Sequence, residues 1–103
     1  MEGYKITTLD AMGYSYGDKY FLDYKKAESE FYERLGAIIQ DREELAQPED
    51  IDGQSPWKIQ NEVDKEQIIK RAYCLLWEET CGFDGCESYI TSEEIIFKKI
   101  EIN

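Results

Sequence analysis

The sequence predicts an α+β fold, in which two helices pack on one face of a small, mostly antiparallel sheet of three to four strands. Three observations support this prediction. Alternating patterns near both ends of the chain predict strands, two internal stretches have helical periodicity, and 103 residues are too few to cover both faces of a sheet. We expect a single domain, residues 1–103, with an acidic linker at about 41–62 between the two helices.

Two strands are expected before the first helix. β-branched and aromatic residues are frequent from about Gly3 to Asp10, which predicts the first strand. A tyrosine-rich run from Tyr14 to Phe21 suits a second strand, joined to the first by a hairpin or an irregular loop.

The strongest helical pattern lies between Asp23 and Gln40. Asp23 is expected to cap the helix, because its carboxylate can accept hydrogen bonds from amides of the first turn. Apolar residues then recur every three or four positions and predict a buried stripe: Tyr24, Ala27, Phe31, Leu35 and Ile38.

A second helix is expected from Asp64 to about Thr80. Asp64 and Gln67 have the spacing of a capping box, and Gly82 is placed to end the helix. Its apolar face would consist of Ile68, Ile69, Ala72, Leu75 and Leu76.

The remaining strand candidates are Ser88–Ile90 and Ile95–Ile102. Ile95 and Phe97 occupy odd positions, whereas Ile100 and Ile102 occupy even ones. A bulge near Lys98 and Lys99 would therefore be needed to place all four side chains on one face of the strand.

Composition constrains the function more than any motif does. Twenty-three acidic residues against twelve basic ones leave a formal charge of -11, which favours a basic partner protein and disfavours direct binding to nucleic acid or to an anionic membrane. The sequence contains no histidine, phosphate-binding loop or nucleophile motif, so we do not expect an enzyme. The chain also has no apparent signal peptide or membrane span, which predicts a cytoplasmic protein, in the host cell if the protein is phage-encoded.

The candidate partner-binding residues are acidic or aromatic. Negative charge is densest between Asp41 and Gly53, which is either a solvated loop or a binding arm. Tyrosine is a favoured interface residue, and several tyrosines precede the first helix. The predicted set is Glu43, Glu44, Glu49, Asp50 and Asp52 in the linker, Glu30 and Glu33 on the helix, and Tyr14 and Tyr16.

Three cysteines are the candidate metal ligands: Cys74, Cys81 and Cys86. Cys81 and Cys86 are separated by four residues in the segment CGFDGC, a spacing that zinc sites use. A disulfide between Cys81 and Cys86 is one alternative, and unpaired cysteines with Cys74 in the core are another. Zinc is therefore the only cofactor that the sequence suggests.

These observations favour a small acidic interaction protein that inhibits a partner by occupying its basic, nucleic-acid-binding surface. In size and charge the chain resembles small inhibitors carried by phages and mobile elements, including some anti-CRISPR proteins. That resemblance is one of composition, without a shared motif. The alternative is a zinc-stabilised or housekeeping structural module whose charge serves solubility.

Overall fold

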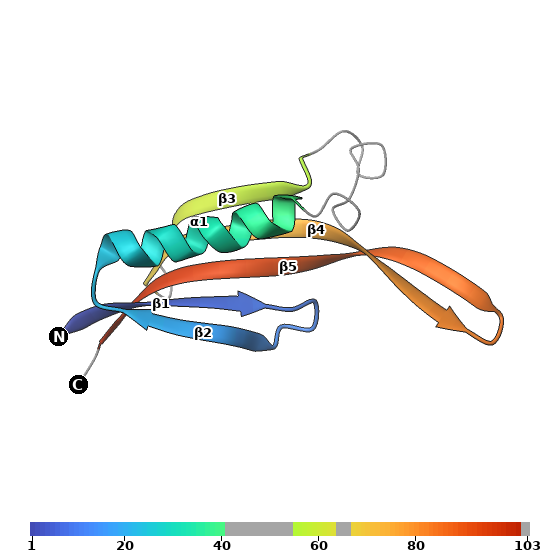
Figure 1. Cartoon of the computed structure of the whole chain (residues 1–103), viewed down its shortest axis with the longest axis horizontal. Helices are drawn as coiled ribbons and strands as arrows, with labels where there is room; N and C mark the ends of the chain where they lie inside the picture. The colour runs from blue at the N-terminus through green and yellow to red at the C-terminus, as the bar shows by residue number, and fades with distance from the viewer. Residues whose placement is uncertain (41–54, 64–66, 102–103) are drawn as a thin grey trace.

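The computed structural model consists of one antiparallel sheet and one helix, and it describes residues 1–40, 55–63 and 67–101 (Figure 1). The strands are β1 (Glu2–Leu9), β2 (Ser15–Phe21), β3 (Trp57–Val63), β4 (Ile68–Gly82) and β5 (Gly85–Glu101), and the helix is α1 (Tyr24–Gln40). The five strands lie in the order β2-β1-β5-β4-β3, and every neighbouring pair is antiparallel.

The predicted fold class is therefore wrong in two respects. The sheet has five strands rather than three or four, and the described residues form one helix rather than two. Part of the predicted linker at 41–62 is strand β3, whereas residues 41–54 lie outside the described residues.

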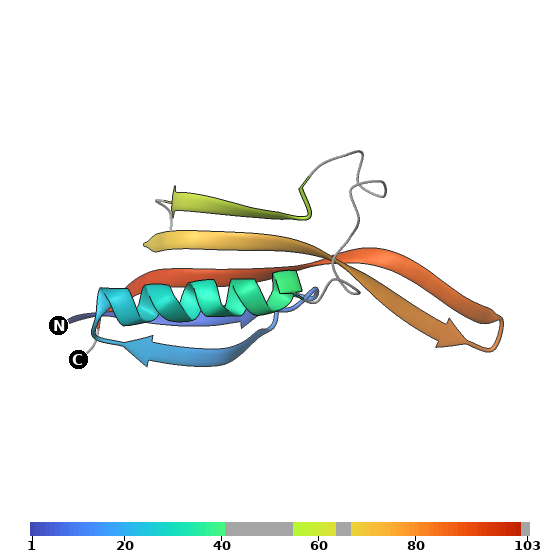
Figure 2. The ribbon, with the colours of Figure 1, turned by 45° about the horizontal axis from the view of Figure 1, so that its top comes forward.

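The predicted first helix is confirmed. Asp23 caps α1, because the Lys25 amide donates to its Oδ1 at 2.9 Å and the Ala27 amide donates to its carbonyl at 3.1 Å. Ala27, Phe31 and Leu35 are buried and form the contact of α1 with the sheet. Figure 2 shows α1 lying across β1 and β5, so the core is the layer between the helix and the central strands.

The predicted second helix is strand β4. Its buried residues alternate along the strand, namely Ala72, Cys74 and Leu76, whereas Ile68, which is also buried, lies beyond a register shift between Ile68 and Lys70. The intervening Lys70 lies at the margin of the core, where its Nζ contacts Glu28 at 3.3 Å. Gln67 has a φ of 58°, so it is a turn residue before the strand and not part of a capping box.

A bulge was predicted near Lys98 and Lys99. The β1–β5 pairing runs without a register shift from Glu2–Glu101 to Leu9–Glu94, whereas the β4–β5 pairing shifts at this level, between Ile68 and Lys70 of β4. β5 is a central strand, and its residues alternate between the two faces. Ile95 and Phe97 face α1 and are fully buried, whereas Ile96 and Ile100 lie on the opposite face and are half-buried.

The molecule is elongated because β4 and β5 continue past their neighbours. β3 last pairs with β4 at Cys74, and β1 last pairs with β5 at Glu94. Residues 75–92 form a two-stranded ribbon, called the arm below, that projects from the body (Figures 1 and 2). The principal extents are 54 × 30 × 25 Å, and the radius of gyration is 15.6 Å. A compact domain of this length has a radius of gyration near 13 Å.

Candidate functional site

The arm is the first candidate site because it extends beyond the last residues at which β4 pairs with β3 and β5 pairs with β1. β4 and β5 pair continuously through it, from Leu75–Ser92 to Gly82–Gly85. An isolated two-stranded ribbon is marginal in water. Cys81 and Cys86 form a disulfide across the two strands, one pair before the turn, with their Cα atoms 4.0 Å apart. This covalent link holds the two strands together at the end farthest from the core.

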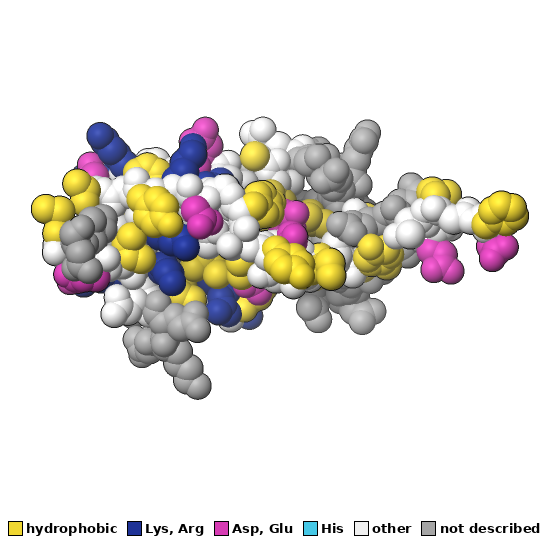
Figure 3. All heavy atoms as spheres, turned by 90° about the horizontal axis from the view of Figure 1, so that it is seen from below, with side chains coloured by type: hydrophobic (Ala, Val, Ile, Leu, Met, Phe, Trp, Pro, Cys, Tyr) yellow, Lys and Arg dark blue, Asp and Glu magenta, His cyan; other side chains and the backbone are white. Residues whose placement is uncertain are grey.

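The tip of the arm presents an aromatic side chain to solvent. Phe83 and Asp84 form the turn, and Gly85 follows with a φ of 118°, a conformation that glycine adopts most easily. Phe83 has a relative exposure of 107% and packs against no part of the core. Figure 3 shows apolar side chains along the face seen from below and again at the end of the arm, next to acidic side chains.

All charged residues of the arm are acidic. Its sequence contains no lysine or arginine and four acidic residues: Glu78, Glu79, Asp84 and Glu87. A projecting ribbon with negative charge and an apolar tip can enter a groove that a compact surface cannot reach. Its field favours contact with a positively charged surface.

The base of the arm adjoins the β1–β2 turn, where several exposed side chains meet. Asp10, Ala11, Met12, Tyr89 and Thr91 line a hollow of about 450 Å³. Met12 is 80% exposed and Tyr89 is 46% exposed, so the rim of this hollow is apolar and accessible.

The two predicted tyrosines lie in different places. Tyr14 is in the β1–β2 turn, where its amide donates to Asp10 Oδ1 at 2.9 Å, so it adjoins a residue that lines this hollow. Tyr16 is in β2 and lines a different hollow, between α1 and β2. Both tyrosines are exposed, at 67% and 50% respectively.

The predicted acidic residues are in different situations. Glu43, Glu44, Glu49, Asp50 and Asp52 lie outside the described residues. Glu33 is exposed on α1. Glu30 is already engaged within the fold, because its Oε1 contacts Lys19 Nζ at 3.2 Å and Arg34 Nε at 3.1 Å.

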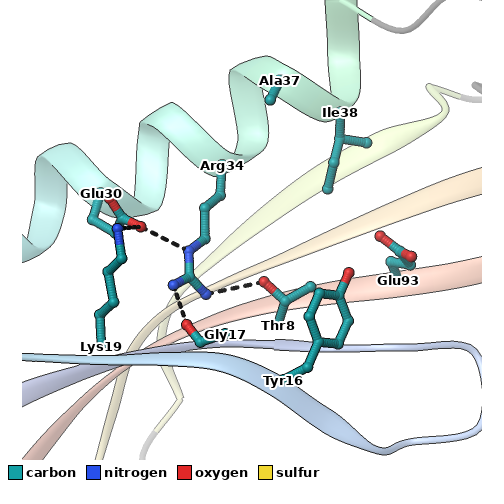
Figure 4. A pocket seen from close by; sticks show the side chains of 9 residues that line it. All are labelled: Thr8, Tyr16, Gly17, Lys19, Glu30, Arg34, Ala37, Ile38 and Glu93. Carbon is teal, nitrogen blue, oxygen red and sulfur yellow. Dashed lines mark hydrogen bonds and ion pairs between the residues drawn. The ribbon is translucent and has the colours of Figure 1, made fainter.

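A second hollow, of about 390 Å³, lies between α1 and β2 (Figure 4). Arg34 crosses it from α1, donating to Thr8 Oγ1 at 3.1 Å and to the carbonyl of Gly17. Glu30 bridges Arg34 and Lys19, and burial of the Glu30 carboxyl opposes ionisation, but these hydrogen bonds outweigh it and lower its pKa. The charges in this hollow satisfy one another, which indicates that they fix α1 on the β1–β2 hairpin rather than bind a ligand.

The three cysteines are not brought together. Cys81 and Cys86 are joined at the end of the arm, whereas Cys74 is fully buried in the core. Cys74 and Cys81 are seven positions apart on β4, a span of roughly 23 Å at the rise of a strand. No group of three or more candidate ligands is placed to hold a metal ion among the described residues.

Cys74 is also a poor nucleophile. Burial, with a smaller contribution from the negative charge of Glu93, raises the pKa of its thiol to about 11. The thiol is therefore neutral at physiological pH, and the thiolate is the reactive form.

The chain matches no protein-family model, no curated protein and no solved structure. Among the described helices none has both the length and the apolar character needed to cross a membrane.

Sequence reasoning missed the arm because it placed most of β4, from Ile68 to about Thr80, in a helix. The segment CGFDGC did attract attention, but as a metal loop. A signal for a hairpin was present, since two cysteines flank a glycine-bounded pair of residues between segments rich in β-formers.

Proposed function

We propose that this protein is a small, acidic, non-catalytic interaction protein. In this proposal it inhibits a partner by inserting its arm into a basic surface that normally binds nucleic acid. The observation that supports this most directly is the arm itself: it projects from the body, has four acidic and no basic residues, and ends in a fully exposed Phe83.

The charge and the tip have different roles in this proposal. The carboxylates replace phosphates opposite lysine and arginine side chains, which speeds association and sets specificity. Phe83 is the anchor, because an aromatic side chain that enters a partner's pocket removes a large apolar area from water. Truncation of Phe83 to alanine should weaken binding by at least about thirtyfold, on the scale of an interface hot spot.

The test is capture from a lysate of a plausible host, with identification of the bound protein by mass. The first variant neutralises the arm with Glu78→Gln, Glu79→Gln, Asp84→Asn and Glu87→Gln. The matched control removes the same charge from the linker with Glu43→Gln, Glu44→Gln, Glu49→Gln and Asp50→Asn. We expect the wild type and the linker variant to capture a basic protein, and the arm variant to lose it.

The captured protein should be displaced by duplex DNA and released in 1 M salt, where the Debye length is about 3 Å. Loss of binding in the linker variant alone would place the site in residues 41–52 and overturn the role of the arm. A complex unaffected by DNA and by 1 M salt would overturn the electrostatic explanation.

A further inference from the structure

We propose that an extended, lysine- or arginine-bearing segment of the partner protein adds to the free edge of β5 in the arm, as an additional antiparallel or parallel strand. This inference rests on the proposed function and specifies how the partner is held. Strand addition to an exposed sheet edge is a common form of peptide recognition, in which backbone hydrogen bonds supply affinity and alternate side chains supply specificity.

The edge is open because β1 ends early. β1 pairs with β5 as far as Leu9–Glu94, and the chain then turns away, with the Asp10 amide donating to the carbonyl of Tyr14 at 2.9 Å. Beyond Glu94, no strand in the described ranges pairs with β5 on the side opposite β4. The edge therefore continues the line of β1 from residue 93 towards the arm tip.

The geometry of the arm shows which backbone groups face this edge. Cys81 and Cys86 are opposite residues with Cα atoms 4.0 Å apart, which is the short separation of a non-hydrogen-bonded pair. The Leu75 amide donates to Pro56, on the side away from β5, so Leu75–Ser92 is also such a pair. The outward-facing amides and carbonyls of β5 consequently belong to Cys86, Ser88, Ile90 and Ser92.

The arm lacks three of the features that usually protect sheet edges. Proline, lysine and bulges discourage pairing of an exposed strand with another chain. Residues 75–92 contain no proline or lysine, and the β4–β5 pairing has no register shift within the arm. In contrast, β2 contains Lys19 and pairs with β1 through a bulge, and β3 contains Lys58.

The chemistry of the surroundings selects the occupant. Four acidic residues in the arm favour a strand with lysine or arginine, and they oppose pairing with the acidic arm of a second copy. Tyr89 and Thr91 share one face of β5 and line the hollow that also includes Met12. This hollow is placed to receive an apolar side chain of the added strand.

The experiment is amide hydrogen exchange of the full chain by NMR, with and without a defined probe. The probe is an end-blocked octapeptide of alternating lysine and valine. We expect the amides of Ser88, Ile90 and Ser92 to exchange fast in the free protein and at least tenfold more slowly with saturating peptide. The amides of Tyr89 and Thr91, which bond to β4, should change little.

Two variants sharpen the test. Ser88→Pro removes an outward amide without removing a β4–β5 hydrogen bond and should weaken peptide binding at least tenfold, whereas Ser88→Thr keeps the amide and should bind like the wild type. Unchanged amide shifts at Ile95 and Phe97 would show that each variant retains the core.

Three results would overturn the inference. The peptide could slow exchange of neighbouring β5 amides alike, without alternation, or a peptide with glutamate in place of lysine could bind equally well. Slower exchange at higher protein concentration without peptide would identify a second copy as the occupant. Failure here is distinguishable from failure of the proposed function. If the variant with the neutralised arm loses the captured partner while the Ser88→Pro variant retains it, the charge of the arm contributes to binding but strand addition at its edge does not.

Discussion

Removal of the Cys81–Cys86 disulfide should make the arm open more easily and leave the packing of the body unchanged. The perturbation is the double substitution Cys81→Ser and Cys86→Ser. The two residues are five apart in sequence, so the bond closes a loop of about six residues in the unfolded arm. The chain-entropy relation then gives a contribution of about 2 kcal/mol. This free energy belongs to opening of the arm because the bond lies beyond the last contact with β1 or β3.

Native-state hydrogen exchange measures the two regions separately. A loss of about 2 kcal/mol corresponds to a roughly thirtyfold faster exchange of protected arm amides, such as that of Tyr89, because each 1.4 kcal/mol is a factor of ten. The amide of Phe97, in the central part of β5, exchanges only when the body opens as well, so it should exchange more slowly than that of Tyr89 in both proteins. Global unfolding includes opening of the arm, so its free energy should also fall by about 2 kcal/mol and the urea midpoint should decrease. If Tyr89 and Phe97 exchange at the same rate in the wild type, the arm is not a separate opening unit and the reasoning is refuted.

The other predictions concern the core and its charges. Phe31→Ala should lower the free energy of unfolding by about 3–5 kcal/mol, because Phe31 is fully buried between α1 and the sheet, where its ring centroid lies 6.3 Å from that of Phe97. The pKa of Glu30 is lowered in the folded state. The stability that its ionised form contributes is therefore fully present at pH values above the ordinary pKa of 4.5, and it is lost as the pH falls through the lower pKa of the folded state. Glu30→Gln should therefore reduce the loss of stability between about pH 5 and pH 3. Cys74 should not react with a thiol reagent at pH 8 in the native protein, and in urea the chain should show one reactive thiol.

Each of these experiments has a matched control. Glu33→Ala alters the exposed face of α1 and should change the urea midpoint little. An equally small change of the midpoint for Phe31→Ala would contradict the packing of Phe31 described above. An unchanged acid profile in Glu30→Gln would show that the carboxylate of Glu30 does not support the fold. Three reactive thiols in urea, measured without reductant, would contradict the Cys81–Cys86 disulfide.

The sequence correctly predicted elements whose signals are local. The cap at Asp23 and the apolar stripe of α1 lie on one element, so their spacing alone identifies the helix. The strand from Gly3 to Asp10 was predicted to within one residue of β1 at each end. Long-range pairing was not needed for either prediction.

The second helix was predicted in error because β4 has apolar residues on both faces. Ala72 and Cys74 face α1, while Tyr73 and Leu75 are half-buried on the other face, so the strand shows no simple alternation. A continuous apolar run fits a helical pattern as well as a strand pattern. The choice depends on β5, which follows β4 after the turn at Phe83 and Asp84 and pairs with it along almost its whole length.

The site was only partly predictable for a similar reason. Tyr14 and Tyr16 were identified by residue type, and both are exposed. The exposure of Phe83 and the open edge of β5 depend on where β1 and β3 stop pairing, which no local pattern encodes.

The strand order has a consequence for folding. β5 is the last strand along the chain, yet it occupies the centre of the sheet between β1 and β4. During synthesis, the β1–β2 hairpin and α1 emerge first but cannot close their core, because Ile95 and Phe97 have not yet been made. Closure joins residues separated by most of the chain, and such a high contact order slows folding. We therefore expect the core to close only after β5 has left the ribosome.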